Sequence, residues 1–214
     1  MDAKELRVYL VTDAGLSGAR GVVETARQAV AGGVTIVQLR DHDASSRQLV
    51  ETAQRLREVT HAAGVPFIVD DRLDVALAVG ADGVHLGQSD LHPVDARRIA
   101  GPKLLIGHSV ASLDELREAG QWPADTVDYL GIGPLRATST KPNAAAPLGY
   151  DGVRAIARTT ALPTVAIGGI GVDDVAPLLA AGVDGVAVVS AICAAPDPAA
   201  AAAELRAAVD GSAS

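Results

Sequence analysis

Hydrophobic and polar positions along the chain follow two alternating periods. Short runs rich in β-branched residues, typical of buried strands, are each followed by a segment in which apolar residues recur with the helical period. The pattern predicts eight strands, at residues 7–13, 35–41, 66–71, 83–88, 103–109, 128–133, 163–169 and 185–191.

Alanine-rich segments between these strands predict helices. After the first strand, four apolar residues share one helical face: Val22, Ala26, Ala29 and Val30. Further helices are predicted at 47–64, 72–80, 92–101, 112–120, 150–160, 173–182 and 198–209. Several end in a glycine, the residue that a left-handed helix C-cap favours: Gly32, Gly64, Gly80, Gly120 and Gly182.

Eight strands alternating with eight helices leave two architectures, an open doubly wound sheet and a closed (β/α)8 barrel. The count of eight and the short connections favour a single (β/α)8 TIM barrel domain of parallel strands over residues 1–214. Polar residues directly after the strands favour it too, because a barrel gathers all strand exits at one face. They are Asp13, Arg40, Asp70, Asp71, Gln88, Ser109, Thr138 to Lys141, Gly168, Gly169 and Ser190.

The composition narrows the classes of function. The 214 residues are 49% hydrophobic and carry a net charge of −8, so a nucleic-acid partner is not expected. A polyanion would need a locally basic site or a metal ion. The start of the chain lacks the features of a secretory signal, and no run of about 18 apolar residues predicts a membrane span. A cytoplasmic location and no membrane partner are the default expectations.

Gln38 and Arg40 alternate along the second strand and therefore point to the same side of it. An amide and a guanidinium inside a barrel mouth are costly to bury unless something pairs with them. One interpretation is that the amide recognises a heterocycle and the guanidinium holds a phosphate. The alternative is an ion pair between Arg40 and Asp41 or Asp43 on the rim.

Three carboxylates follow neighbouring strands: Asp70 and Asp71 after the third, and Asp90 after the fourth. Mg²⁺ prefers hard oxygen ligands of this kind together with substrate phosphates. Helix capping is the alternative, by Asp71 near Leu73 and by Asp90 near Pro93. The presence of all three on adjacent strand exits favours a metal site.

Two other loops carry groups suited to phosphate. Gly168, Gly169 and Ser190 follow the last two strands, where barrels often bind phosphate through backbone amides. The segment "GPLRATSTKPN", residues 133–143, places three hydroxyls and a lysine in one loop. Taken alone, such a cluster of Gly, Pro, Ser and Thr is typical of a solvated turn.

The histidines and the one cysteine indicate no nucleophilic triad. His85 is expected in or near the core, whereas His108 is a candidate for lining the mouth. Cys193 has no histidine near it in the sequence and is expected to be a buried thiol.

An ordered set of segments resembles the thiamine-phosphate synthase family: "QLRDH", "VDDRLDVALAVGADGVHLGQSDL", "IGHS", "GPLRATSTKPN", "AIGGI" and "VAVVSAI". The resemblance implies a (β/α)8 barrel whose substrates are hydroxymethyl-aminopyrimidine pyrophosphate and a thiazole phosphate, and which joins the pyrimidine to the thiazole. Thiamine phosphate forms, pyrophosphate is released, and Mg²⁺ is the cofactor.

The resemblance also implies roles for individual residues. Gln38, Arg40 and His42, with Leu39 and Asp41 in the same segment, would hold the pyrimidine pyrophosphate. Asp70 would lie beside that substrate, while Asp71 and Asp90 would ligate the metal. Ser109 would contact the pyrimidine, and Lys141 the pyrophosphate. The thiazole phosphate would be held by Thr138, Ser139, Thr140, Gly169, Val189 and Ser190. Arg40, Ser109 and Lys141 would be the catalytic residues.

The chain departs from the family pattern in three ways: His42 replaces a lysine, Asp70 replaces an asparagine, and the segment before Thr138 lacks the aromatic residue often found there. Two alternatives remain beside the synthase. One is the related thiazole tautomerase, which binds only the thiazole half and needs neither metal carboxylates nor Lys141. The other is a non-catalytic barrel that binds a phosphate ligand. The expected partners are small-molecule substrates, and the oligomeric state is open, with a homo-oligomer as one alternative.

Overall fold

The strands close into a barrel in the order of the sequence, with β8 pairing β1 and every pair parallel. The computed structural model describes residues 2–138 and 145–212. Each of the eight predicted strands is present, which confirms the (β/α)8 architecture. The strands are β1 (Val8–Val11), β2 (Ile36–Leu39), β3 (Phe67–Asp70), β4 (Gly83–Leu86), β5 (Leu105–Val110), β6 (Tyr129–Ile132), β7 (Thr164–Ile167) and β8 (Gly185–Val188).

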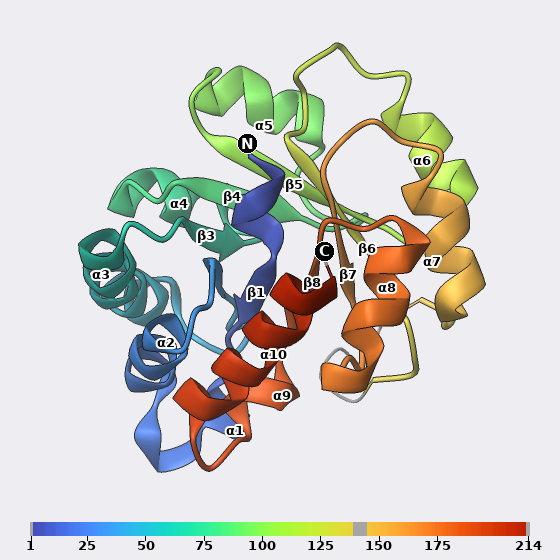
Figure 1. The fold of residues 1–214 in the computed structure, drawn as a ribbon. Helices are drawn as coiled ribbons and strands as arrows, with labels where there is room; N and C mark the ends of the chain where they lie inside the picture. Colours follow the sequence, from blue (N-terminus) through green and yellow to red (C-terminus); the bar gives the residue numbers. More distant parts are fainter. Residues whose placement is uncertain (1, 139–144, 213–214) are drawn as a thin grey trace.

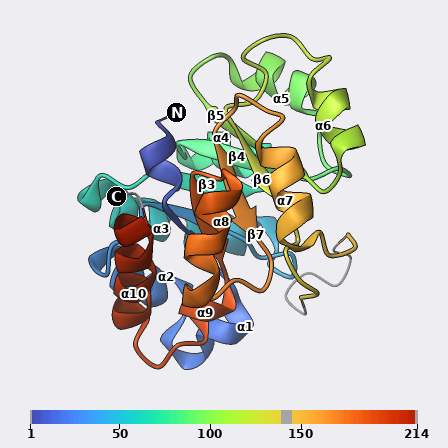
Figure 2. The ribbon, with the colours of Figure 1, turned by 45° about the vertical axis from the view of Figure 1, so that its right-hand side comes forward.

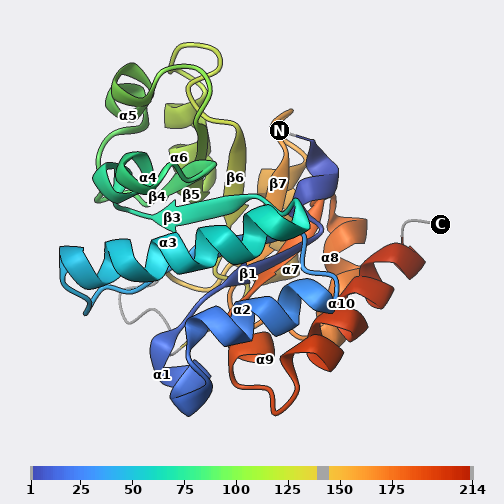
Figure 3. The same ribbon diagram turned by 90° about the vertical axis from the view of Figure 1, so that its left-hand side faces the viewer.

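Helices surround this barrel, and Figures 1 and 2 show them around its outside, with α2, α3 and α10 along the side seen in Figure 3. The long helices are α2 (Val22–Ala31), α3 (Ser46–Ala63), α4 (Leu73–Val79), α5 (Pro93–Ala100), α6 (Leu113–Ala119), α7 (Gly149–Ala157), α8 (Val175–Ala181) and α10 (Pro198–Ser212). Shorter pieces are η1 (Ala3–Leu6), α1 (Ala14–Ser17), η2 (Gly18–Arg20), η3 (Val172–Asp174) and α9 (Ser190–Cys193).

Helix ends follow the predicted glycines only in part. Gly64, Gly80 and Gly182 adopt the left-handed conformation expected at a C-cap. Gly32 and Gly120 do not, since both keep right-handed backbone angles at the end of their helices. The glycine signal therefore placed the helix ends correctly without fixing the geometry of each cap.

Two apolar layers hold the barrel together. The larger lies between strands and helices, and the smaller fills the interior with alternate strand residues, among them Tyr9, Ile36, Ile68 and Tyr129. Fully burying one aliphatic side chain contributes about 1.5–3 kcal/mol. Strands buried on both faces explain why the sequence shows continuous apolar runs rather than strict alternation.

Aspartates directly before β4, β6 and β8 stabilise the N-terminal end of the barrel. Each accepts a hydrogen bond from the first or second backbone amide of the preceding strand. Asp82 accepts from Phe67 N at 2.8 Å, and Asp184 accepts from Thr164 N at 2.8 Å. Asp128 accepts from Ile106 N at 2.7 Å. The carboxylates at this end are thus engaged with the backbone of the barrel itself.

The C-terminal strand ends meet at the opposite face, because all strands run in one direction. In Figure 1 the N-terminal segment lies at the top, and α1 and α9, which follow β1 and β8, lie at the bottom. Within the described residues, no helix is both long and apolar enough to cross a membrane.

Candidate active site at the C-terminal face of the barrel

Charged side chains from β2 and β3 meet at this face. Arg40 directly follows β2, and its Nε lies 3.6 Å from Oδ2 of Asp70, the last residue of β3. His42 Nε2 lies 3.6 Å from the same oxygen. The side chains of Arg40 and Asp70 are only 15% and 12% exposed. Arg40 thus pairs with a carboxylate at the end of the neighbouring strand.

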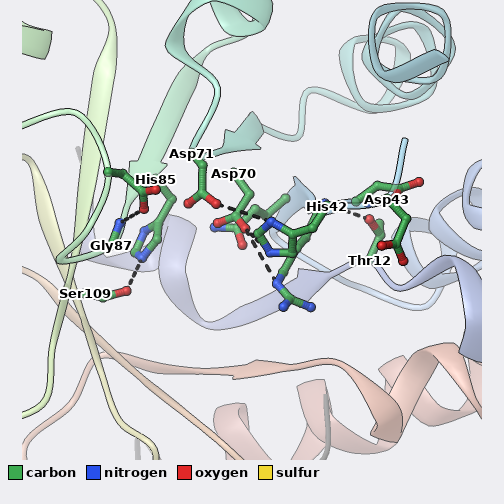
Figure 4. A network of polar contacts seen from close by, with 12 residues as sticks. Thr12, His42, Asp43, Asp70, Asp71, His85, Gly87 and Ser109 are labelled. Carbon is green, nitrogen blue, oxygen red and sulfur yellow. Dashed lines mark hydrogen bonds and ion pairs between the residues drawn. The ribbon is translucent and has the colours of Figure 1, made fainter. Parts of the chain in front are cut away.

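Asp71 completes this group from the other side. Its Oδ2 lies 3.5 Å from Nδ1 of His42, so the imidazole stands between two carboxylates, as Figure 4 shows. Asp71 has a φ of 57°, in the left-handed region that non-glycine residues rarely adopt. Its backbone N–H donates to His85 O at 2.8 Å. Strained backbone of this kind concentrates at functional sites and is kept there by the surrounding structure.

The donor atoms of these residues fit a metal site. One ligand atom from each of His42, Asp70 and Asp71 lies within 4.8 Å of the others. The N-cap of α4 is Arg72 rather than Asp71. Asp70 and Asp71 carry the hard carboxylate oxygens that Mg²⁺ prefers.

Asp90 lies in the connection after β4. Its Oδ2 accepts a hydrogen bond from Gly87 N at 2.7 Å within the connection after β4. It does not cap α5, whose N-cap is His92. Among the described residues, the group of three possible ligands contains Asp70 and Asp71 but not Asp90. The predicted pairing of Asp71 with Asp90 as metal ligands stays a prediction.

A chain of polar side chains crosses the barrel interior below this group. The Gln38 amide donates to the Tyr9 hydroxyl at 2.9 Å, and that hydroxyl lies 2.8 Å from the hydroxyl of Tyr129. Tyr129 Oη lies 3.1 Å from Nδ1 of His85. The opposite ring nitrogen of His85 lies 2.9 Å from Ser109 Oγ, as Figure 4 shows. Two residues predicted to contact substrate, Gln38 and Ser109, thus form the two ends of one network.

Burial keeps the two tyrosines in this chain neutral. Loss of hydration raises the pKa of Tyr9 and of Tyr129 above the ordinary tyrosine value. Either tyrosine hydroxyl can donate to the other, and the roles of the two His85 ring nitrogens depend on its tautomer. Gly107 leaves room for the contact, since a Cβ there would lie 2.5 Å from His85 Nδ1.

His108 does not line the mouth, contrary to the sequence-based expectation. Its side chain is buried on the helix side of β5, and its ring packs edge-on against Trp122 at a centroid distance of 5.1 Å. Neighbouring residues of a strand point to opposite faces, so Ser109 inside requires His108 outside. Gln88 connects the two residues, lying 3.1 Å from His108 Nε2 and donating to Ser109 O at 2.7 Å.

The remaining residues of the predicted pyrophosphate segment face other directions. Leu39 is buried in the outer apolar layer. Asp41 Oδ1 accepts from Asp43 N at 3.1 Å and from Ala44 N at 3.0 Å, which closes the turn before α3. These contacts do not involve the group formed by Arg40, His42, Asp70 and Asp71.

The predicted phosphate side lies after β6, β7 and β8. Gly168 and Gly169 have φ angles of 106° and 68°, where a side chain would be strained. Val189 directly precedes α9 and Ser190 begins it. Thr138 is half-buried in the connection after β6. Three predicted site residues lie outside the described part of the chain: Ser139, Thr140 and Lys141.

Comparison with known proteins decides the family. A model of the family described as thiamine monophosphate synthase matches residues 8–192. The chain belongs to this family. A thiamine-phosphate synthase of Chloroflexus aurantiacus is 54% identical over 203 residues, covering 95% of this chain and 92% of that protein. One of Azorhizobium caulinodans is 49% identical, with 97% of each chain covered.

Solved structures give the same result. The thiamine phosphate pyrophosphorylase of Pyrococcus furiosus superposes with a TM-score of 0.89 and 40% identity, covering 99% of both chains. The barrel and the order of its elements are thus those of a thiamine monophosphate synthase family member.

For this family member, sequence reasoning missed the middle of the interior network. Tyr9 and Tyr129 are two of only three tyrosines in the chain, and both fall within predicted strands. Their rarity in a core otherwise built of aliphatic residues was the available signal. Residues 120 positions apart in sequence meet only through closure of the barrel, so the pairing itself was not readable.

Proposed function

We propose that this protein condenses hydroxymethyl-aminopyrimidine pyrophosphate with a thiazole phosphate at the C-terminal mouth of its barrel. The products are thiamine phosphate and pyrophosphate, so the enzyme is a transferase. Membership of the thiamine monophosphate synthase family supports this activity. The convergence of Arg40, His42, Asp70 and Asp71 at adjacent strand ends is the observation that carries the assignment of the site.

The pyrophosphate of the first substrate is assigned to the Arg40 side of the mouth. Arg40 and Lys141 stabilise the negative charge that grows on the leaving group as its bond to carbon breaks. Asp71 and Asp90 would hold Mg²⁺, which would supply further positive charge to the phosphates. His42 takes the place of the lysine found in relatives and donates to the same phosphates when it is protonated.

Asp70 replaces the asparagine of the family, and its local contacts explain how an added carboxylate is tolerated. Its negative charge lies 3.6 Å from both Arg40 Nε and His42 Nε2. An ion pair with Arg40 lowers the repulsion that a free carboxylate would exert on pyrophosphate. The same charge attracts Mg²⁺ toward the mouth.

The pyrimidine is assigned to the two ends of the interior network. When the Gln38 amide nitrogen donates to Tyr9, its oxygen is the end left to accept from an exocyclic amino group. Ser109 Oγ, which lies 2.9 Å from His85 Nε2, is assigned to a ring nitrogen of the pyrimidine. A ring with an amino group beside a ring nitrogen matches this pair of contacts.

The thiazole phosphate is assigned to Thr138, Ser139 and Thr140 with the glycine turn and the start of α9. Gly169, Val189 and Ser190 present backbone and hydroxyl donors there. Holding the thiazole by its phosphate places its nitrogen near the pyrimidine methylene carbon.

The reaction requires no protein nucleophile. The carbon–oxygen bond to pyrophosphate breaks, the electron-rich aminopyrimidine stabilises the resulting cation, and the thiazole nitrogen forms the new carbon–nitrogen bond. Cys193, the one thiol, is unsuited to attack because burial raises its pKa to about 11.

Release of pyrophosphate from the purified protein tests this proposal. With Mg²⁺ and both substrates we expect steady release, and omission of either substrate should stop it. A thiazole tautomerase would release none and would show no heat on titration with Mg²⁺ and pyrophosphate. A non-catalytic barrel would bind the ligands without release. Absence of release with both substrates present would contradict the synthase assignment.

A further inference from the structure

An imidazole from one connection meets two carboxylates from the end of the neighbouring strand. His42 Nε2 lies 3.6 Å from Asp70 Oδ2, and His42 Nδ1 lies 3.5 Å from Asp71 Oδ2. Figure 4 shows the three side chains pointing toward one another. We refer to His42, Asp70 and Asp71 as the His42 triad. Within residues 2–138 and 145–212, it is the one place where three His, Cys, Asp or Glu side chains bring one possible ligand atom each within 4.8 Å of the others.

The spacing of the triad is close to that of a metal site. Metal–ligand bonds of about 2.0–2.2 Å place two ligand atoms at right angles roughly 3 Å apart. The nitrogen–oxygen distances in the triad are about half an ångström longer than that. The His42 side chain is 51% exposed, whereas Asp70 and Asp71 are 12% and 26% exposed. The ring can therefore turn one nitrogen toward both carboxylates without displacing core residues.

The local charge attracts a cation. Arg40 Nε lies 3.6 Å from Asp70 Oδ2 and supplies one positive charge against the two carboxylates. With a neutral imidazole the site is therefore negative, and a bound divalent ion compensates that charge. The exposed side of the triad leaves further coordination positions for water or for phosphate oxygens from the mouth of the barrel.

The donor set distinguishes this site from one made of oxygen atoms alone. Mg²⁺ is a hard cation that binds oxygen ligands and keeps several waters. Imidazole nitrogen favours first-row transition metals, which also accept carboxylate oxygen. One nitrogen and two carboxylate oxygens thus favour a transition-metal ion over Mg²⁺. Mn²⁺ binds most weakly in that series, so it is the strictest probe of the preference.

We propose that His42, Asp70 and Asp71 bind a divalent first-row transition-metal ion through one imidazole nitrogen and two carboxylate oxygens. The role of this ion in turnover rests on the proposed function, whereas its binding does not. Asp71 is common to this site and to the Mg²⁺ assignment, and His42 distinguishes the two. With the transition-metal ion bound, His42 is a ligand of the ion; with Mg²⁺ it remains a donor to phosphate.

Mn²⁺ binding to the metal-stripped protein without substrates is the first test. Calorimetry and the paramagnetic resonance signal of the free ion measure the dissociation constant, and competition with Mg²⁺ gives the preference. We expect one Mn²⁺ to bind at the triad about tenfold or more tightly than Mg²⁺. Absence of Mn²⁺ binding, or equal affinity for the two ions, would overturn the inference.

His42→Ala, with His61→Ala as the matched control, tests the nitrogen ligand. His61 is an exposed histidine in the last turn of α3, away from the triad. Losing a residue that only orients a metal ligand costs about 10- to 100-fold in affinity, so losing a ligand should weaken Mn²⁺ binding at least tenfold. Mg²⁺ affinity should change less than about threefold, since Mg²⁺ relies on the oxygens. His61→Ala should leave both affinities unchanged, and equal effects of the two variants would contradict ligation by His42.

Pulsed paramagnetic resonance of bound Mn²⁺ identifies the ligand atom directly. Wild type and His61→Ala should show coupling of the ion to an imidazole nitrogen, and His42→Ala at saturating Mn²⁺ should not. Absence of this coupling in the wild type would overturn the inference, and that result does not depend on whether any variant folds. Coupling that persists in His42→Ala would also overturn it.

Three aspartate variants define the oxygen ligands. Asp70→Asn and Asp71→Asn should each weaken Mn²⁺ binding about tenfold or more, because each removes a charged ligand. Asp90→Asn should leave it within about twofold, since Asp90 accepts from Gly87 N and lies outside the triad. Weaker binding in Asp90→Asn together with unchanged binding in Asp70→Asn would overturn the assignment of the site.

Pyrophosphate release separates this inference from the proposed function. Nitrogen coupling to bound Mn²⁺ without release from both substrates, whichever ion is added, would overturn the proposed function and leave the metal site in place. Release with Mg²⁺ but no nitrogen coupling to bound Mn²⁺ would overturn the inference alone.

Discussion

Aspartates at the two ends of the barrel do different work. At the N-terminal end, Asp82, Asp128 and Asp184 each accept a hydrogen bond from the backbone of a neighbouring strand. At the C-terminal end, Asp70 and Asp71 face the cationic or ionisable groups of Arg40 and His42. The same residue type therefore stabilises strands at one end and, in the proposed function, binds substrate and metal at the other.

The local sequences explain this difference. The N-terminal aspartates immediately precede a strand, where their carboxylates reach the free amides at the start of the adjacent one. Asp70 ends β3, and Asp71, which follows it with a left-handed backbone, lies 3.5 Å from His42 Nδ1. In the proposed function, placement before or after a strand thus separates a structural carboxylate from one in the active site.

Removal of the metal should have the largest effect on turnover, and it should affect only the C-terminal end of the barrel. With EDTA in excess we expect turnover to fall about a hundredfold or more, because the growing charge on pyrophosphate loses its main stabilisation. The Tm without substrate should not change, since the N-terminal carboxylates need no ion. Pyrophosphate release and thermal unfolding, each measured with EDTA and after Mg²⁺ is restored, check this. Full activity in EDTA would contradict a role for the metal in turnover.

Tyr129→Phe should have the next largest effect, because it interrupts the interior network between the two pyrimidine contacts. Removing this hydroxyl leaves Tyr9 and His85 without one partner each, at about 1–3 kcal/mol. We expect the KM for the pyrimidine substrate to rise about tenfold, with the thiazole phosphate KM nearly constant. An unchanged pyrimidine KM would show that the network does not orient Gln38 and Ser109.

Asp184→Ala tests the structural role of the aspartates at the N-terminal end of the barrel. Loss of its bond to Thr164 N should lower the free energy of unfolding by about 1–3 kcal/mol. Turnover by the folded fraction should remain at the wild-type level, because the change lies at the far end of the barrel from the mouth. Chemical denaturation and kcat together measure the two quantities. A fall in kcat with an unchanged free energy of unfolding would contradict the proposed division between structural and active-site aspartates.

The smallest expected effect is on the pH dependence of the Tm, compared between wild type and Asp174→Asn. Pairing with Arg136 holds the pKa of Asp174 below its ordinary value of 3.8. The stabilisation is therefore present above about pH 4 and is lost as the pH falls below that, where the unfolded chain binds a proton first. We expect the Tm gap between wild type and Asp174→Asn to narrow by about 2–4 °C between pH 6 and pH 3. A gap that widens toward low pH would contradict the sign.

The barrel itself was readable from the sequence because its signals are local. Strand period, helix period and glycine-terminated helices each depend on neighbouring residues, and together they predicted the eight-stranded closure. Alternation also placed Gln38 and Arg40 on one side of β2, where Gln38 reaches the interior and Arg40 the mouth. The same rule, applied to Ser109, would have corrected the expectation for His108.

Contacts between distant segments were not readable. Arg136 and Asp174 are 38 residues apart, and nothing in either local sequence indicates that one binds the other. The N-terminal aspartates are similar, since a carboxylate before a strand does not reveal which neighbouring amide it meets. Such pairs depend on how far adjacent strands are staggered, which is settled only when the barrel closes.

The most direct test compares pyrophosphate release by Asp71→Asn and by Asp128→Asn, each normalised to its folded fraction. Both variants remove one negative charge with little change in shape, one at each end of the barrel. The account predicts that Asp71→Asn turns over at about one hundredth of the wild-type rate or less, and that Asp128→Asn stays within about twofold of wild type. Equal rates in the two variants would contradict the assignment of chemistry to the C-terminal mouth.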